Sequence, residues 1–279
     1  MKGPIMRNHY LKATSILTNS RGNIFEDLFQ YVFGIAIIAV VAYFLLGYGV
    51  NTLVARIPVN VENRIFSNYG APQSSQPVGA NAANSESFAK LQNILEKLIS
   101  NKEVPPLNYR LFIIDQESPN AVAMPGGGIG VTRGLISALK EEPALAFVLG
   151  HELGHFRYRD HLRGLGRIMA IRMIVAYFLG DSEIGSLIGT NALSLMDKKY
   201  SREQEEAADR FGVGLVFNSY GDVKGTTRLF EILEKSESSP KWAYMFSTHP
   251  ATSARIAALK KYAGELKSAK ETPVRNPVK

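Results

Sequence analysis

The chain contains no cysteine, and tryptophan occurs only once among its 279 residues. Without cysteine there can be no disulfide, no thiolate metal ligand and no cysteine nucleophile. The redox compartment is left open, because a chain without thiols suits oxidising and reducing conditions equally. Long apolar runs are also scarce: only one stretch is both apolar and free of charge over the length that a bilayer requires.

The net charge is +7 and the isoelectric point is about 9.4. A basic balance can indicate a nucleic acid or an anionic membrane surface as a partner. Here the basic residues are scattered along the chain, with some bias to its two ends. They form no compact cluster with aromatic residues, so we expect no nucleic-acid partner.

The uncharged apolar segment covers residues 31–50. About twenty apolar residues allow a helix to cross the hydrocarbon core of a bilayer. Tyr31, Tyr43 and Tyr48 lie towards its ends, where interfacial aromatic residues gather. The run is too long for the core of a cleaved signal peptide. We therefore expect one transmembrane helix, and the positive residues before it favour a cytoplasmic tail over residues 1–30.

The rest of the chain would lie beyond the membrane. A polar, low-complexity stretch at 66–87 predicts a juxtamembrane segment and flexible loop over residues 51–87. A folded domain is predicted over 88–265, and a basic tail over 266–279. A helix should begin at Phe88, because the apolar residues that follow share one helical face.

Strands are predicted in the first part of this domain, and helices in the rest. The expected strands are 109–115, 120–124 and 130–132, with a glycine-rich turn at 125–128. A second apolar region, 168–196, is interrupted by charged residues and glycines. Its uncharged runs are too short to span a bilayer, which favours a core or interfacial helical hairpin. A re-entrant membrane segment is the alternative.

The pattern that carries chemistry is His151-Glu152-Leu153-Gly154-His155, which follows an apolar stretch with helical periodicity. Residues four apart lie on one face of a helix, so His151 and His155 can bind one zinc ion through their imidazoles. Glu152 lies about 100° further round the helix. Its carboxylate would therefore lie beside the metal, where it can act as a general base.

A catalytic zinc site takes three protein ligands, so a third ligand must lie elsewhere. Of the five histidines, His9 precedes the membrane span, and His161 would lie on the opposite face of a continued helix. The acidic segment 200–210 is the better source. Glu205 and Asp209 are four apart in it, so one could bind zinc while the other accepts the free N–H of a ligand histidine.

Four segments, taken in order, resemble peptidase family M48, the family of the HtpX, BepA and Oma-type zinc metalloendopeptidases. They are Asn120 to Gly127, His151 to His155, Ser201 to Asp209, and Ser247 to Pro250 with Arg255 and Ile256. Together they span roughly residues 105–260. Val122 stands where the family usually has phenylalanine, and Gly128 is additional in the glycine turn. The single clear membrane span makes the chain similar to the singly anchored members.

The resemblance implies an α+β fold, with a mostly helical, gluzincin-like zinc metallopeptidase core and a small β-sheet, preceded by one transmembrane helix. It implies one Zn²⁺ ion per subunit, held by His151, His155 and Glu205. It gives Glu152 the catalytic role, and it places Asp209 behind the ligands as support.

Two further residues are candidates for the substrate side of the reaction. The edge strand that begins near Asn120 is expected to pair with an extended substrate. His249 is the candidate donor to the tetrahedral oxyanion, because it and His161 are the remaining histidines on the catalytic side. Arg255 is expected to anchor local structure and not to contact substrate.

The predicted function is that of a membrane-anchored zinc metalloendopeptidase that hydrolyses protein or peptide substrates. Misfolded membrane or envelope proteins are the expected substrates, and the lipid bilayer is the other expected partner. A membrane-bound chaperone or scaffold with little proteolysis is the alternative, and a structural zinc site is a third reading. We expect an inner (plasma) membrane location with the catalytic domain in the periplasm. The mitochondrial inner membrane, facing the intermembrane space, is the alternative location.

Overall fold

The computed structural model describes residues 24–66, 82–179, 200–226, 228–235, 245, 248–250 and 253–271. The chain divides into two compact units, residues 1–49 and 50–279. The described part of the first unit is a single long helix, α1 (Ile24–Arg56), whose last turns belong to the second unit.

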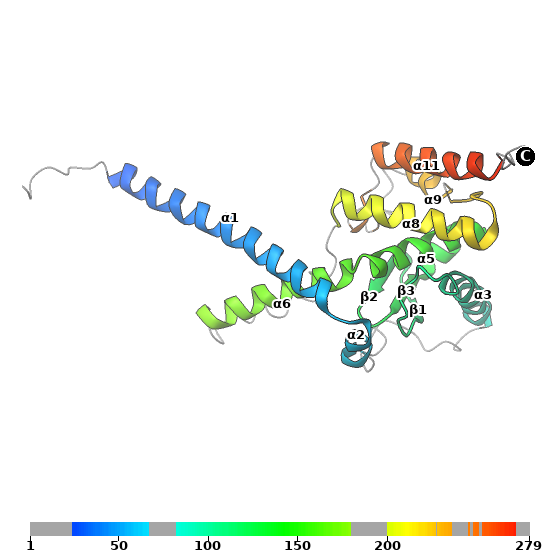
Figure 1. The fold of residues 1–279 in the computed structure, drawn as a ribbon, viewed down its shortest axis with the longest axis horizontal. Helices are drawn as coiled ribbons and strands as arrows, with labels where there is room; N and C mark the ends of the chain where they lie inside the picture. The colour runs from blue at the N-terminus through cyan, green and yellow to red at the C-terminus, as the bar shows by residue number, and fades with distance from the viewer. Residues whose placement is uncertain are drawn as a thin grey trace, which may run out of the picture. The chain divides into compact units, whose positions relative to one another are not determined.

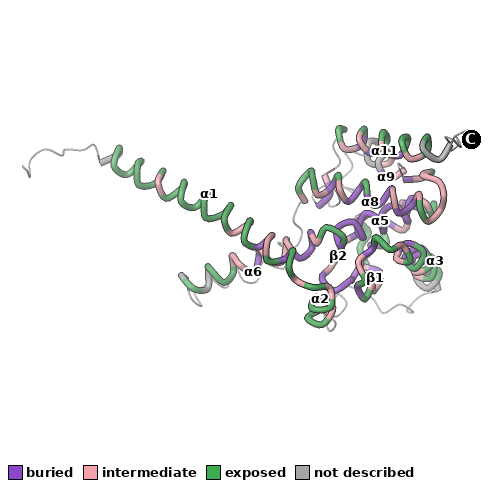
Figure 2. Tube along the Cα trace, in the orientation of Figure 1, coloured by how far each residue is buried: buried purple, intermediate pink, exposed green. Residues whose placement is uncertain are grey.

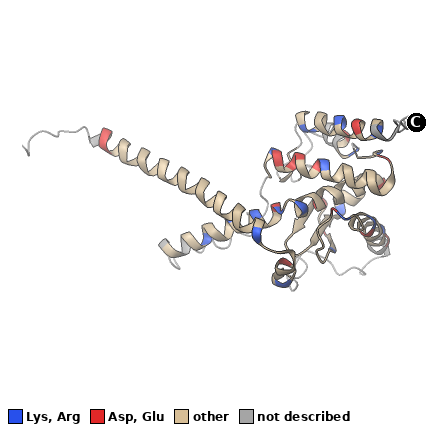
Figure 3. Cartoon of the chain, in the orientation of Figure 1, with Lys and Arg blue, Asp and Glu red and all other residues tan. Residues whose placement is uncertain are grey.

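Helix α1 is apolar along nearly its whole length. No charged residue lies between Asp27 and Arg56 (Figure 3). Its apolar side chains are exposed through most of the helix (Figure 2). By length and composition it could cross a membrane, and within the described ranges it is the one helix that meets that criterion. The helix predicted at 31–50 is therefore confirmed, and it extends further at both ends.

The second unit is mostly helical, with one small sheet. Its helices are α2 (Val59–Phe66), α3 (Ala82–Ile99), α4 (Arg133–Ala138), α5 (Glu142–Arg157), α6 (Asp160–Leu179), α8 (Arg202–Tyr220), α9 (Arg228–Lys235) and α11 (Ser253–Glu271). Its strands are β1 (Arg110–Ile114), β2 (Ala121–Met124) and β3 (Gly128–Thr132). The α+β class predicted from the sequence is confirmed.

The sheet has the strand order β1-β3-β2, so β2 lies at an edge, as predicted. Strand β3 pairs in parallel with β1 and antiparallel with β2. The turn between β2 and β3 depends on Gly126 and Gly127, whose φ angles are 79° and 85°. Side chains with a β-carbon rarely adopt this left-handed region, which explains the glycines in the predicted turn.

Helix α5 lies in the core, between the sheet and α8 (Figure 1). Every residue of α5 from Ala144 to Phe156 is buried. Small residues let α5 and α8 approach closely: a β-carbon at Gly154 would lie 2.7 Å from the Cα of Ala208. Helix α8 is capped by Ser201, whose hydroxyl accepts from the amide of Gln204 in a capping box.

Two helices extend past the segment bounds that the sequence suggested. Helix α3 begins at Ala82, within the stretch that was predicted to be a flexible loop; residues 67–81 lie outside the described ranges. Helix α11 continues to Glu271, into the predicted tail. Low sequence complexity and charge are weak signals of a helix end, because neither removes the backbone hydrogen bonds of a helix.

The helix that carries the histidine pair ends at Arg157, and α6 starts at Asp160. The sequence-based assumption of a continued helix is therefore wrong, and His161 faces a different environment. On α6, the side chains of Met173, Ile174 and Tyr177 are exposed. The second half of the predicted hairpin lies beyond Leu179, outside the described residues.

Candidate metal centre

Helices α5 and α8 bring the predicted metal ligands together. The Nε2 atoms of His151 and His155 lie 3.1 Å apart. Each lies 3.6 Å from a carboxylate oxygen of Glu205, which projects from the first turns of α8. Tetrahedral zinc with bonds of about 2.0–2.1 Å places its ligand atoms about 3.3 Å apart. These three side chains therefore have the spacing and the chemistry of a zinc site.

His249 contributes a fourth donor to the same cluster. Its Nδ1 lies 2.9 Å from Oε1 of Glu205 and 3.3 Å from Nε2 of His151. The ligand atoms of the four residues all lie within 4.8 Å of one another, and all four residues are buried. The sequence placed His249 in the site as an oxyanion donor, whereas the geometry also allows it to be a metal ligand.

The outer nitrogen of each α5 histidine is held by its own carboxylate. Nδ1 of His151 donates to Asp209 at 2.9 Å, and Nδ1 of His155 donates to Asp160 at 3.1 Å. With Nδ1 protonated, the lone pair of each ring lies on Nε2, which faces the cluster. Asp209 was predicted for this task. The contact of Asp160 with His155 was not predicted from the sequence. It forms because α5 ends at Arg157 and the chain turns before α6.

Arg255 of α11 binds two of the carboxylates. Its Nε and Nη2 donate to Asp209 at 2.5 and 2.8 Å, and its Nη1 lies 2.5 Å from Oε2 of Glu205. The guanidinium matches a carboxylate with two parallel bonds, so it fixes the carboxylate plane as well as its position. Arg255 therefore does more than the local anchoring expected from the sequence.

The pKa values of Glu205 and Asp209, the two buried carboxyls of α8, are both lowered. Burial alone would raise the pKa of Glu205, but the charge and hydrogen bond of His249, with the charges of His151 and Arg255, outweigh it. Burial likewise opposes ionisation of Asp209, and its bonds to Arg255 and His151 reverse the effect and lower its pKa. Both carboxyls are therefore anionic at neutral pH.

Burial lowers the pKa of His155, an effect that its bond to Asp160 only partly offsets. The neutral imidazole that results is the form that binds a metal.

The ring of Tyr200 stacks on that of His155, with centroids 3.8 Å apart and planes 18° apart. Burial raises the pKa of this phenol. The stacking of Tyr200 on His155 was also not predicted, because no local sequence pattern indicates that a residue before an acidic helix contacts a ring on another helix.

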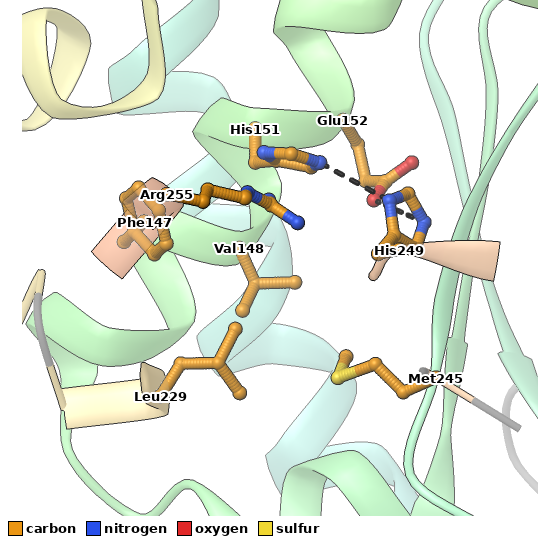
Figure 4. Close-up of a pocket in the computed structure, with 8 residues that line it drawn as sticks. All are labelled: Phe147, Val148, His151, Glu152, Leu229, Met245, His249 and Arg255. Atoms are coloured by element: carbon orange, nitrogen blue, oxygen red, sulfur yellow. Dashed lines mark hydrogen bonds and ion pairs between the residues drawn. The ribbon is translucent and has the colours of Figure 1, made fainter. Parts of the chain in front are cut away.

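Glu152 lies beside the cluster on the wall of a pocket (Figure 4). Its Oε1 is 3.8 Å from Nε2 of His249. Its Oε2 is buried and has no hydrogen-bond partner among the residues that the structure describes. An apolar part of the pocket lining includes Val148, one turn before Glu152 on α5, together with Leu229 and Met245. A buried carboxylate oxygen without a protein partner is what a residue that exchanges a proton with bound reactants requires.

Asn120 lies just before β2 and is buried. Its backbone exchanges hydrogen bonds with Thr132, and its side-chain oxygen lies 3.4 Å from the hydroxyl of Thr248. Thr248 precedes His249, so Asn120 connects the start of the edge strand to the loop that carries His249. This contact was not foreseen from the sequence.

A buried site with two histidines from one helix and a glutamate from another defines the zinc-binding class of metallopeptidases with this ligand set. The family model for Peptidase family M48 matches residues 85–263. The chain belongs to peptidase family M48. The matched range contains all four residues of the cluster, together with Glu152 and both supporting aspartates.

Curated relatives come from bacteria and eukaryotes. The chain is 27% identical to the mitochondrial metalloendopeptidase OMA1 of Schizosaccharomyces pombe, over 65% of this chain and 55% of the relative. It is 29% identical to a protease HtpX homolog of Acidiphilium cryptum, over 65% of this chain and 77% of that protein. It is 30% identical to the metalloprotease LoiP of Escherichia coli K12, over 62% and 69% respectively. The match covers little more than half the length of the Schizosaccharomyces pombe protein.

Proposed function

We propose that this chain is a membrane-anchored zinc metalloendopeptidase, with His151, His155 and Glu205 as the zinc ligands. The observation that carries the proposal is Glu152, whose buried and unpartnered carboxylate oxygen lies beside a compact set of metal-binding atoms. Membership of a peptidase family and relatives named as metalloproteases support the same activity.

Each residue of the site has a distinct role in the proposed peptide hydrolysis. Bound zinc would polarise the scissile carbonyl and activate water as a nucleophile. Glu152 would accept a proton from the attacking water and deliver it to the leaving amine. His249 lies on the Glu152 side of the cluster, where its imidazole can donate to the oxyanion or complete the resting metal shell. Asp209 and Asp160 hold the ligand rings in the metal-binding tautomer.

An extended substrate would lie against the edge strand β2 and place one apolar side chain in the pocket beside Glu152. The free edge of a sheet can pair with a peptide backbone, which gives affinity without strong sequence selection. The apolar wall formed by Val148, Leu229 and Met245 favours an apolar side chain next to the scissile bond. Such recognition suits unfolded proteins, and we propose misfolded membrane or envelope proteins as the substrates.

The apolar helix α1 would hold the peptidase unit at a bilayer. We place the anchor in the bacterial inner membrane, with the catalytic unit on the periplasmic side and the N-terminus in the cytoplasm. The alternative is the mitochondrial inner membrane, and OMA1 relatives are named as mitochondrial proteins. A chaperone or scaffold without proteolysis is not supported, because it would have no use for Glu152 beside the metal-binding atoms.

Glu152→Gln, in the full-length chain purified in detergent, tests Glu152 as the proton acceptor. The amide keeps the size of the side chain but cannot accept a proton, so casein cleavage should fall by about 10²-fold to 10⁴-fold. Zinc content, measured by elemental analysis, should stay at one ion per chain.

Glu206→Gln is the matched control, since Glu206 lies next to Glu205 on α8 but is exposed and pairs with Arg210. It should retain both activity and zinc. Glu205→Gln should lose zinc and activity together. Cleavage by Glu152→Gln at the rate of the unaltered protein would contradict the mechanism, and full zinc content in Glu205→Gln would reassign the third ligand.

A further inference from the structure

Glu62 is the one buried residue of the short helix α2, and the proposed reaction does not use it. Its residue is 1% exposed. Burying a carboxylate costs free energy that is recovered only when charged or hydrogen-bonding partners surround it. The partners of Glu62 therefore show what this helix is fastened to.

Three partners surround the carboxylate, two from the segment just after α5 and one from the β2–β3 turn. Oε1 accepts from Nε2 of His161 at 2.8 Å and from the backbone N–H of Gly126 at 3.2 Å. Oε2 lies 3.5 Å from Nη2 of Arg159. Burial opposes ionisation, but the hydrogen bond and charge of His161, the amide of Gly126 and the charge of Arg159 together lower the pKa of Glu62.

His161 connects Glu62 to the metal-binding helix. Its Nδ1 lies 3.3 Å from the backbone oxygen of His155, one of the metal ligands. Its ring packs against that of Phe156, with centroids 4.6 Å apart. A single imidazole thus bridges the juxtamembrane helix α2 and the last turn of α5.

Arg159 connects the same carboxylate to the end of α1. Its Nη1 donates to the backbone oxygens of Val54, at 2.9 Å, and Ile57. Val54 lies in the last turn of α1, and its oxygen also accepts from the N–H of Ile57, the residue that follows the helix. A cation stabilises carbonyls at the C-terminal end of a helix. Arg159 has a φ of 59°, a region that disfavours a side chain with a β-carbon. Glycine would fit that backbone better, but glycine could not make these contacts.

Gly126 connects Glu62 to the turn that follows β2. A β-carbon at Gly126 would lie 2.5 Å from Cβ of Phe66, the last residue of α2. Arg110 at the start of β1 donates to the backbone oxygen of Phe66 at 3.2 Å. Helix α2 therefore packs directly on the β2–β3 turn and holds one end of the edge strand.

We propose that Glu62 is a positioning residue whose carboxylate sets the edge strand β2 against the metal-binding helix and fastens both to the end of α1. This role rests on the proposed peptidase function, because β2 is the strand assigned to the substrate. Glu62 touches no metal ligand side chain, so its loss leaves the zinc site assembled. The effect falls on the alignment of the strand, and therefore on substrate binding more than on the chemical step.

The test is Glu62→Gln in the full-length chain, purified in detergent. The amide has the size of the carboxylate but no charge for Arg159 and His161. A charge-assisted hydrogen bond is roughly twice as strong as a neutral one, so KM for unfolded casein should rise about tenfold. Values of kcat should stay within about twofold, and zinc content should stay at one ion per chain. Hydrogen exchange should accelerate in residues 121–130.

Glu96→Gln is the control, because Glu96 is an exposed glutamate of α3 that accepts from Gln92 on the same helix. It should change none of these quantities. Glu62→Asp keeps the charge on a shorter side chain and should give an intermediate KM. This graded response would not follow from a general loss of folded protein.

An unchanged KM with unchanged exchange in 121–130 overturns the proposal. So does exchange that rises evenly across the domain while kcat falls and KM stays constant, since that pattern reports only a smaller folded fraction. If the unaltered protein binds zinc but cleaves nothing, the proposed function fails. The exchange comparison then still decides whether Glu62 holds the edge strand, because it requires no activity.

Discussion

At the scale of single residues, the centre depends on carboxylates that bind no metal themselves. His151 and His155 each donate Nδ1 to a buried aspartate, and Arg255 grips one of these aspartates together with Glu205. These bonds orient the predicted ligand side chains. Such orientation lowers the entropic cost of binding, and it fixes which ring nitrogen is available to the ion.

Asp160→Asn tests this arrangement at the position that the sequence did not reveal. The amide can present its N–H₂ group to Nδ1 of His155, which would favour the wrong tautomer. We expect zinc affinity to fall about 10-fold to 100-fold, measured by competition with a chromophoric chelator. Arg163→Gln is the comparison variant. Nη1 of Arg163 lies 3.6 Å from Oδ1 of Asp160, so this change removes one partly exposed partner of Asp160 and leaves its bond to His155 in place. An unaltered zinc affinity in Asp160→Asn would show that Asp160 does not orient His155 for metal binding.

At the scale of elements, the site depends on how closely α5 and α8 approach. Gly154 faces the backbone of Ala208, and a β-carbon added at Gly150 would lie 3.1 Å from the Cα of Gly212. Because backbone cannot move aside as a flexible side chain can, a methyl group at these contacts must separate the helices. The distance from Glu205 on α8 to the histidines on α5 would increase with that separation.

Gly154→Ala should therefore destabilise the protein in spite of the higher helix propensity of alanine. We expect a loss of about 1–3 kcal/mol in the free energy of unfolding, with weaker zinc binding. Gly164→Ala on α6 is the matched control, because nothing lies within 4 Å of its added β-carbon. It should be neutral or stabilising by up to about 1 kcal/mol. Thermal unfolding of both variants measures the contrast, and equal melting temperatures would refute it.

At the scale of the whole molecule, the proposal combines a peptidase unit with an apolar anchor. The first unit, in its described part, is the exposed apolar portion of α1, whereas the second has its own extended hydrophobic core. The family match begins at residue 85 and so does not include the anchor. The proposed membrane attachment of this chain is thus separate from its family membership, and it requires its own experiment.

The paired substitution Ile37→Lys and Val41→Lys tests the anchor. Each lysine at the centre of a spanning helix costs about 2.5–3.5 kcal/mol of insertion free energy. We expect the unaltered chain to stay in the membrane pellet after alkaline carbonate extraction, and the double variant to appear in the supernatant. Val61→Lys, on the exposed face of α2, should stay in the pellet. Extraction of the unaltered chain would rule out a spanning α1.

The sequence by itself determined the features that depend on local patterns. An uncharged apolar run of sufficient length indicates α1, alternating and glycine-flanked segments indicate the three strands, and the spacing of His151 and His155 places both imidazoles on one helical face. The family resemblance singled out Glu205. The structure confirms these elements and brings Glu205 to the two histidines, because the relevant distances along the chain are short or are carried by a recurring motif. The roles of the three side chains as zinc ligands stay a prediction.

Only the tertiary structure decided which groups meet across long separations. Asp160 reaches His155 because α5 ends where periodicity alone would continue it. Arg255 binds Asp209 because α11 packs on α8, and Glu62 binds His161 although the two are far apart in the chain. No local pattern encodes such contacts, since they arise when a helix break or a turn redirects the chain. Helix α5 thus supplies two of the predicted metal ligands, and the packing around it decides which other side chains meet them.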